Sequence, residues 1–190
     1  MNVKRVALVI GHTVGADKGA YSTILKTAEY PYWLDVANRI KAIGNCKVDI
    51  YDVYTHSIQS YYEREKALAD KINKSGIVYD AVLELHFNAA SPAAHGTECL
   101  YWFGSKKGIQ IAQQLSNAVA KDLGMTLRGV NGSRALVNKN DRGYWFVYLQ
   151  KYPAVITELF FGTNEGDCKI FENRQRVAEV LNKAILNLNL

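Results

Sequence analysis

Short apolar runs alternate along this chain with longer segments of helical periodicity, and this alternation constrains the fold more than any other feature. Residues 6–10 are apolar and mostly β-branched, as in a parallel strand covered on both faces. Residues 29–43 carry apolar side chains at helical spacing, with Pro31 in the first turn and Gly44 directly after the last residue. Strands that alternate with helices predict an α/β domain with a mostly parallel sheet and helices on both faces.

The rest of the chain continues this pattern. Further strands are predicted at residues 47–53, 80–87, 96–103, 135–137 and 153–160. Further helices are predicted at residues 60–74, at residues 105–123 and over much of 167–188. Ser60 and Glu63 stand at the spacing of a capping box, and Gly124 ends the third helix. Because 190 residues with 48% hydrophobic content can bury one substantial core, we expect a single domain over residues 1–190.

Composition limits the classes of partner and the cellular compartment that we expect for this chain. A net charge of +5 favours anionic partners, but the basic residues are scattered and do not form the stripe typical of nucleic-acid binders, so nucleic acid is not expected. The three cysteines are far apart without CxxC spacing, and we expect buried thiols in a protein made in a reducing cytoplasm. The N-terminal apolar run stops at Gly11 without a cleavage site, so neither a signal peptide nor membrane insertion is expected.

Polar residues stand where several predicted strands end. His12 follows the first strand, His86 lies near the end of the third, and Glu158 lies near the end of the last. Ligands of open α/β sheets bind at the carboxyl ends of the strands, so these residues are candidates for a site. Period-two alternation puts Glu84 and His86 on one face of their strand. Glu29 opens a helix, where the exposed backbone amides favour an ionised carboxylate.

Two imidazoles and one carboxylate match the three-ligand set of catalytic zinc sites, which leaves a position open for water. Taken singly, each histidine is more often a hydrogen-bonding residue and the glutamate a capping charge, so the prediction depends on the combination. Glu158 is harder to explain by structure alone, because a carboxylate within PAVITELFF is costly to bury without a partner. His56 and His95 lie in polar segments and are expected to be solvated, with His95 as the reserve ligand.

Together with their neighbours, these residues resemble the zinc-dependent N-acetylmuramoyl-L-alanine amidases. The likeness is carried, in this order, by VALVIGHTVGADKGA, AEYPYWLDVANRI, AVLELHFNAA, HGTECLYW and PAVITELFFGTNEGD. The resemblance implies that His12, Glu29 and His86 hold one Zn²⁺ and that Glu158 is the catalytic glutamate. It also implies a twisted sheet of about six strands, within the usual range for sheets.

The resemblance extends to residues around the expected site. Arg64 matches a recurrent arginine in the helix after the second strand, for which a structural role is implied. Asn88 matches a polar position beside the ligand and is predicted to contact substrate, although a turn asparagine is the alternative. The chain departs from the family at residues 13–15, where the family often has a second glycine after its GH pair. Residues 128–143 follow the family pattern only loosely, and both departures concern substrate-facing loops.

The resemblance implies a reaction as well as a fold. A zinc hydrolase of this kind cleaves the amide bond between the lactyl group of N-acetylmuramic acid and L-alanine of the peptidoglycan stem peptide, which leads to cell-wall lysis. Glu158 would carry the proton from water to the departing amine. One alternative is a zinc peptidase that cuts within the stem peptide. Another is a non-catalytic wall-binding module, which would not need an acid such as Glu158 beside three ligands.

The implied partner is bacterial peptidoglycan, and the positive charge also permits anionic wall polymers. We expect no wall-binding module in addition to the amidase domain. Because no signal peptide is visible, we expect the protein to be made in the cytoplasm and to act on the wall after release, as an endolysin or autolysin does. The oligomeric state stays open.

Overall fold

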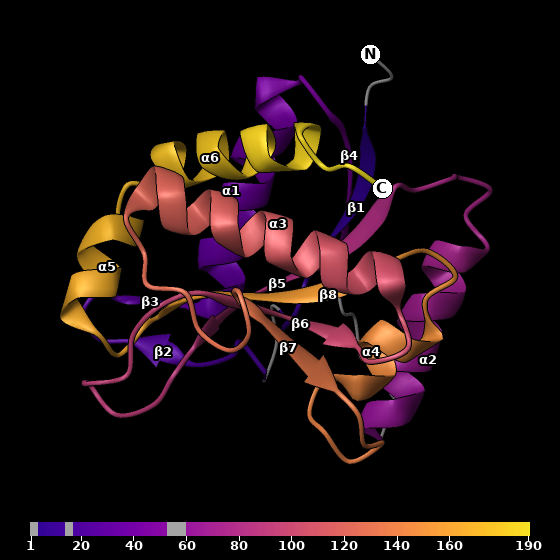
Figure 1. The fold of residues 1–190 in the computed structure, drawn as a ribbon, viewed down its shortest axis with the longest axis horizontal. Helices are drawn as coiled ribbons and strands as arrows, with labels where there is room; N and C mark the ends of the chain where they lie inside the picture. Colours follow the sequence, from indigo (N-terminus) through magenta and orange to yellow (C-terminus); the bar gives the residue numbers. More distant parts are fainter. Residues whose placement is uncertain (1–3, 14–16, 53–59) are drawn as a thin grey trace.

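The central element of the fold is a six-stranded sheet, seen in a computed structural model that describes residues 4–13, 17–52 and 60–190 (Figure 1). Its strand order is β4-β1-β5-β8-β6-β7. In that order the strands are Lys47–Asp52, Arg5–Ile10, Ala81–Asn88, Ala154–Phe161, Glu98–Trp102 and Ser133–Leu136. The first four run parallel, whereas β6 is antiparallel to β8 and parallel to β7. The mostly parallel sheet of about six strands is therefore confirmed.

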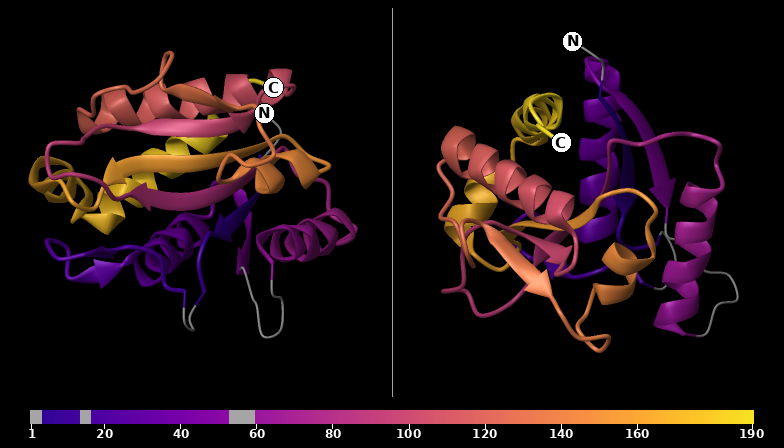
Figure 2. Two further views of the ribbon diagram at one scale, coloured as in Figure 1. Left: turned by 90° about the horizontal axis from the view of Figure 1, so that it is seen from below. Right: turned by 45° about the vertical axis from the view of Figure 1, so that its right-hand side comes forward.

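Helices cover both faces of this sheet (Figures 1 and 2). On one face α1 (Glu29–Ile43), α3 (Lys106–Leu123) and α6 (Arg174–Leu186) pack together. On the other face α2 (Tyr61–Asn73) packs against α4 (Tyr144–Leu149). The central strands alternate between two apolar cores, since Leu8 and Leu83 lie in the first core while Val9 and Val82 lie in the second. Burial on both faces is the reason that these strands are apolar throughout.

Capping residues set the ends of several helices where the sequence predicts them. Ser60 Oγ accepts a hydrogen bond from the backbone N–H of Glu63 at 3.2 Å, which starts α2. Gly44 and Gly124 end α1 and α3 in the left-handed conformation, with φ of 76° and 73°. Glycine adopts this conformation without steric cost, so both stops follow from the sequence.

Three features differ from the sequence-based expectation. A separate antiparallel ribbon forms between β2 (Tyr21–Ser22) and β3 (Thr27–Ala28), and the short helix α4 was not predicted. The predicted helix over residues 167–188 is two helices, α5 (Glu165–Phe171) and α6. The break occurs because Asn173 Oδ1 accepts a hydrogen bond from the backbone N–H of Arg176 at 3.0 Å and caps a new helix.

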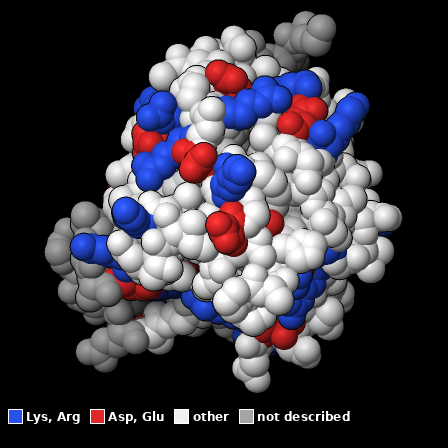
Figure 3. All heavy atoms as spheres, turned by 90° about the vertical axis from the view of Figure 1, so that its left-hand side faces the viewer, with Lys and Arg blue, Asp and Glu red and all other residues white. Residues whose placement is uncertain are grey.

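The surface and the cysteines agree with the expectations from composition. Basic and acidic side chains lie interspersed on the face of the molecule shown in Figure 3. Cys46, Cys99 and Cys168 are all buried free thiols. Among the helices of the described ranges, none is both long and apolar enough to cross a membrane.

The aromatic core beneath α1 gives a stability prediction. Phe160 is fully buried, and its ring stacks on Phe171 with centroids 4.2 Å apart. We expect Phe160→Ala to lower the free energy of unfolding by about 3–5 kcal/mol, because the truncation removes apolar contact and leaves a cavity. Urea denaturation measures this change. The control Val130→Ala, at a side chain that is 72% exposed, should change it by no more than about 0.5 kcal/mol. Equal effects of the two substitutions would contradict this packing.

Candidate metal centre and active site

The carboxyl-end edge of β1, β5 and β8 borders a cavity of ≈ 580 Å³. Its lining includes the five residues that the sequence predicts to bind metal, act in catalysis or contact substrate: His12, Glu29, His86, Asn88 and Glu158. Residues far apart along the chain are thus brought into one cavity, at the edge where ligands of open α/β sheets bind.

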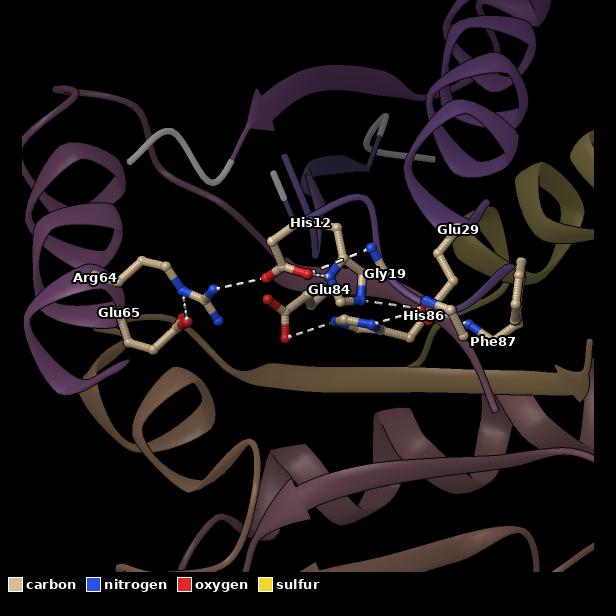
Figure 4. A network of polar contacts seen from close by, with 10 residues as sticks. His12, Gly19, Glu29, Arg64, Glu65, Glu84, His86 and Phe87 are labelled. Atoms are coloured by element: carbon tan, nitrogen blue, oxygen red, sulfur yellow. Dashed lines mark hydrogen bonds and ion pairs between the residues drawn. The ribbon is translucent and has the colours of Figure 1, made fainter. Parts of the chain in front are cut away.

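Both histidines of this cavity contact the Glu29 carboxylate (Figure 4). Its Oε2 lies 3.1 Å from His86 Nδ1 and 3.4 Å from His12 Nε2, and accepts a hydrogen bond from the backbone N–H of Phe87 at 3.1 Å. Its Oε1 accepts another from the backbone N–H of Ala20 at 2.9 Å. Burial would raise the pKa of Glu29, but the polar contacts and charges of the two histidines outweigh this effect and lower the pKa to about 2. Glu29 is therefore a carboxylate ion at neutral pH.

His12 presents one ring nitrogen to Glu29 and the other to an acid. Its Nδ1 lies 3.0 Å from Asp17 Oδ1. Burial raises the pKa of Asp17, but His12, the backbone N–H of Gly19 and Arg64 together lower it below its ordinary value. Because an ionised Asp17 can only accept, Nδ1 of His12 donates the proton. Nε2 is buried and makes no hydrogen bond with the described residues, so its lone pair faces the cavity.

His86 has the reverse arrangement. Its Nδ1 faces Glu29, while its Nε2 lies 3.4 Å from Glu84 Oε2 (Figure 4). Burial lowers the pKa of His86, but the charges and hydrogen bonds of Glu84 and Glu29 raise it well above the ordinary value. The ring fits against the end of β1 because Gly11 has no side chain, and a Cβ there would overlap the imidazole. The sequence gives Glu84 no role, although an acid in an apolar strand is the same signal that singles out Glu158.

His12, Glu29 and His86 form a candidate metal site. Each offers one ligand atom, and these atoms lie within 4.8 Å of one another. The unbonded, buried Nε2 of His12 fits a metal ligand, since a buried polar atom without a partner is otherwise unfavourable. Metal-ligating histidines usually donate their second N–H to a carboxylate, and Asp17 and Glu84 stand in those positions. The residues present therefore fit a zinc ion.

Glu158 lies next to this site on β8. In the sheet register it is opposite His86 on one side and Glu98 on the other. Its Oε2 is buried and makes no hydrogen bond in the described part of the chain. Burial raises the pKa of Glu158 to about 7, against the opposing charge of His86. A carboxyl group with this pKa can both accept and donate a proton near neutral pH.

Arg64 supports the site from α2. Its Nη1 lies 3.3 Å from Asp17 Oδ2, and its Nε lies 3.1 Å from Glu65 Oε1 (Figure 4). Glu65 is almost fully buried, and burial together with the charge of Glu84 raises its pKa. Arg64 thus holds the acid that orients His12, in agreement with the structural role that the sequence implies.

The remaining sequence-based candidates are less informative. His95 is exposed and does not line the cavity, which agrees with a solvated residue. His56 and residues 14–16 lie outside the described residues. Asn88 ends β5 and lines the cavity, and its backbone carbonyl accepts a hydrogen bond from the N–H of Gly162 at 2.8 Å. Its contact with substrate stays a prediction.

β7 and the segment after it also reach the cavity, although the sequence indicates only a polar loop with a short strand there. Arg134 of β7 lines the cavity, as do Asn140, Asp141 and Arg142 of the following loop. Their position depends on how the loop folds back toward β8, and no local sequence signal predicts it.

Comparisons with known proteins agree with this fold. A sequence profile of the N-acetylmuramoyl-L-alanine amidase family matches residues 6–188. The catalytic domain of the CD27L endolysin targeting Clostridia difficile is 24% identical, with a TM-score of 0.75 over 98% of this chain and 99% of that chain. The amidase Ami1 from Mycobacterium smegmatis is 18% identical, with a TM-score of 0.72 over 96% and 94%. AmiC2 of Nostoc punctiforme is 19% identical, with a TM-score of 0.71 over 96% and 95%. No curated protein sequence matches the chain.

The candidate metal site gives a direct test by metal analysis. We expect the purified protein to hold close to one zinc per chain, and His12→Ala and His86→Ala each to lose most of it, because each substitution removes a ligand. Elemental analysis after gel filtration measures the zinc content. His95→Ala is the matched control and should keep its zinc. Retention of zinc by His86→Ala together with loss by His95→Ala would show that the ligands are assigned wrongly.

Proposed function

The chain belongs to the N-acetylmuramoyl-L-alanine amidase family of peptidoglycan hydrolases, and on that premise we propose that it is a zinc-dependent lytic enzyme of the bacterial cell wall. The bond it cleaves joins the lactyl group of N-acetylmuramic acid to L-alanine of the stem peptide. The observation that carries the proposal is the convergence of His12, Glu29 and His86 within 4.8 Å, in the cavity that Glu158 also lines.

Each ligand would bind zinc through the atom that faces the cavity: Nε2 of His12, Oε2 of Glu29 and Nδ1 of His86. Asp17 and Glu84 would accept hydrogen bonds from the N–H groups of the opposite ring nitrogens and thereby keep the facing nitrogens free to coordinate. When bound, zinc supplies Lewis acidity, which acidifies water and polarises the carbonyl of the scissile amide.

Glu158 moves the proton in this reaction. Its carboxylate accepts a proton from the attacking water and delivers it to the L-alanine nitrogen as the C–N bond breaks. Glu158 Oε2 makes no hydrogen bond within the described ranges, which supports this role because no described protein group competes with water for this oxygen. Its place opposite His86 in the register puts it next to the metal ligands.

We also propose that the protein acts on the wall after it leaves the cytoplasm, as an endolysin or autolysin does. The similarity to the catalytic domain of an endolysin is consistent with this role.

Digestion of purified peptidoglycan tests the reaction. The zinc-loaded enzyme should release intact stem peptides with a new L-alanine amino terminus, which mass spectrometry detects. A chelator should abolish this release and added zinc should restore it, because in the proposed mechanism the zinc ion activates the attacking water. Fragments cut between amino acids would instead support a zinc peptidase. Wall binding without any cleavage would support a non-catalytic module.

Glu158→Gln separates a proton carrier from a metal ligand. Glutamine keeps the shape and the hydrogen-bonding capacity of glutamate but does not accept the proton, so turnover should fall by about 10²–10⁴-fold. Zinc content and binding to sedimented peptidoglycan should stay close to those of the wild type. Loss of zinc would make Glu158 a ligand, and full turnover would place the proton carrier elsewhere.

A further inference from the structure

The walls of the catalytic cavity carry opposite charges. The acids Asp17, Glu29 and Glu84 lie around the two histidines, whereas Arg134 lies in β7 and Arg142 in the loop between β7 and α4. Both arginines are exposed, and neither side chain makes an ion pair or a hydrogen bond within the described residues. Two cations that line an active-site cavity without an acidic partner are positioned to meet an anionic substrate.

The third arginine of the cavity differs from these two. Arg64 forms ion pairs with Asp17 at 3.3 Å and with Glu65 at 3.1 Å, so its charge is already balanced within the protein. Only Arg134 and Arg142, among the lining arginines that the structure describes, keep their guanidinium groups available to a ligand.

The backbone that carries the two arginines is held in place. Asp141 Oδ2 accepts hydrogen bonds from the backbone N–H groups of Val137 and Asn138, both at 2.8 Å. Asp141 forms no ion pair with Arg134, although the charge of Arg134 contributes to the lowering of its pKa. Arg134 itself lies in β7, in register with Leu100 of β6. The arginines are therefore presented from ordered backbone, which limits the entropy lost when a ligand binds.

Arg142 lines the same cavity as Glu158 and the two histidines. An anion bound by Arg142 would therefore lie in the cavity that contains the proposed reacting groups.

We propose that Arg134 and Arg142 bind a carboxylate of the stem peptide and select substrates whose second residue, directly after L-alanine, carries a free carboxylate. The proposal rests on the proposed function. In peptidoglycan this residue is a glutamate linked through its side chain, and its α-carboxyl group is either free or amidated. Consecutive Cα atoms are about 3.8 Å apart, so this group enters the same cavity as the scissile amide. Guanidinium groups bind carboxylates through paired N–H donors, a contact that a neutral carboxamide does not reproduce.

A pair of muramyl tripeptides tests the selection. The second residue is D-isoglutamate in one and D-isoglutamine in the other, and in both it is linked through its side chain to the third residue, so the two differ only in an α-carboxylate against an α-carboxamide. The zinc-loaded wild type should cleave the carboxylate substrate with a kcat/KM about 10-fold to 100-fold higher, as expected for one or two charge-assisted hydrogen bonds. Equal kcat/KM for the two substrates would overturn the proposal. Cleavage of neither substrate or of intact wall would instead overturn the proposed function.

Substitution assigns the selection to the two arginines. Arg134→Gln and Arg142→Gln should each reduce the preference for the carboxylate substrate several-fold, while zinc content and melting temperature stay unchanged because both side chains are exposed. Arg176→Gln removes an exposed arginine from α6, on the opposite face of the sheet, and should keep the wild-type preference. A loss of rate that is equal for both substrates, with the preference intact, would overturn the proposal.

Discussion

The whole site depends on the Glu29 carboxylate, because a single oxygen of this residue joins three separate parts of the chain. Oε2 faces His12 after β1 and His86 on β5, and it also accepts the backbone N–H of Phe87. Glu29 itself is the first residue of α1, so its position is set by the packing of that helix on the sheet. Carboxylates behind the two histidines then fix the ring nitrogens that face the cavity. A shift of α1 would therefore disturb all three candidate ligands together.

Much of the fold follows from sequence because hydrophobic period, helix caps and strand alternation agree with one another. Ser60 and Gly124 mark helix ends that the structure reproduces. The parts that were missed lack such signals. The residues of α4, YWFVYL, are apolar or aromatic on all sides of the helix, so they show no helical period. Its N-cap is Gly143, with a φ of 93°, so no side chain caps the helix either. The reversed direction of β6 depends on tertiary pairing with β8, which local sequence does not encode.

The candidate site residues that lie at strand ends could be predicted from the sequence. His12, His86 and Glu158 follow apolar runs, and parallel strands bring their carboxyl ends to one edge of the sheet. The supporting contacts were not predictable, because they join side chains from elements whose relative positions come only from the fold. Arg64 reaches Asp17 across 47 positions of sequence, and neither residue carries a local signal of that contact. The same holds for Arg142, which reaches the cavity only because the loop before α4 folds back toward it.

The distribution of charge links the candidate metal centre to the proposed substrate. Glu29, Glu65, Glu84 and Glu158 crowd the region of the histidines, and burial raises the pKa of both Glu65 and Glu158 because their negative charges are poorly solvated. A divalent cation held at Glu29 would offset this excess of negative charge, so the acids favour a metal ion at the floor of the cavity. The same acids repel an acidic peptide that approaches them. The carboxylated substrate that we propose would therefore need cations at the wall of the cavity, which is where Arg134 and Arg142 lie.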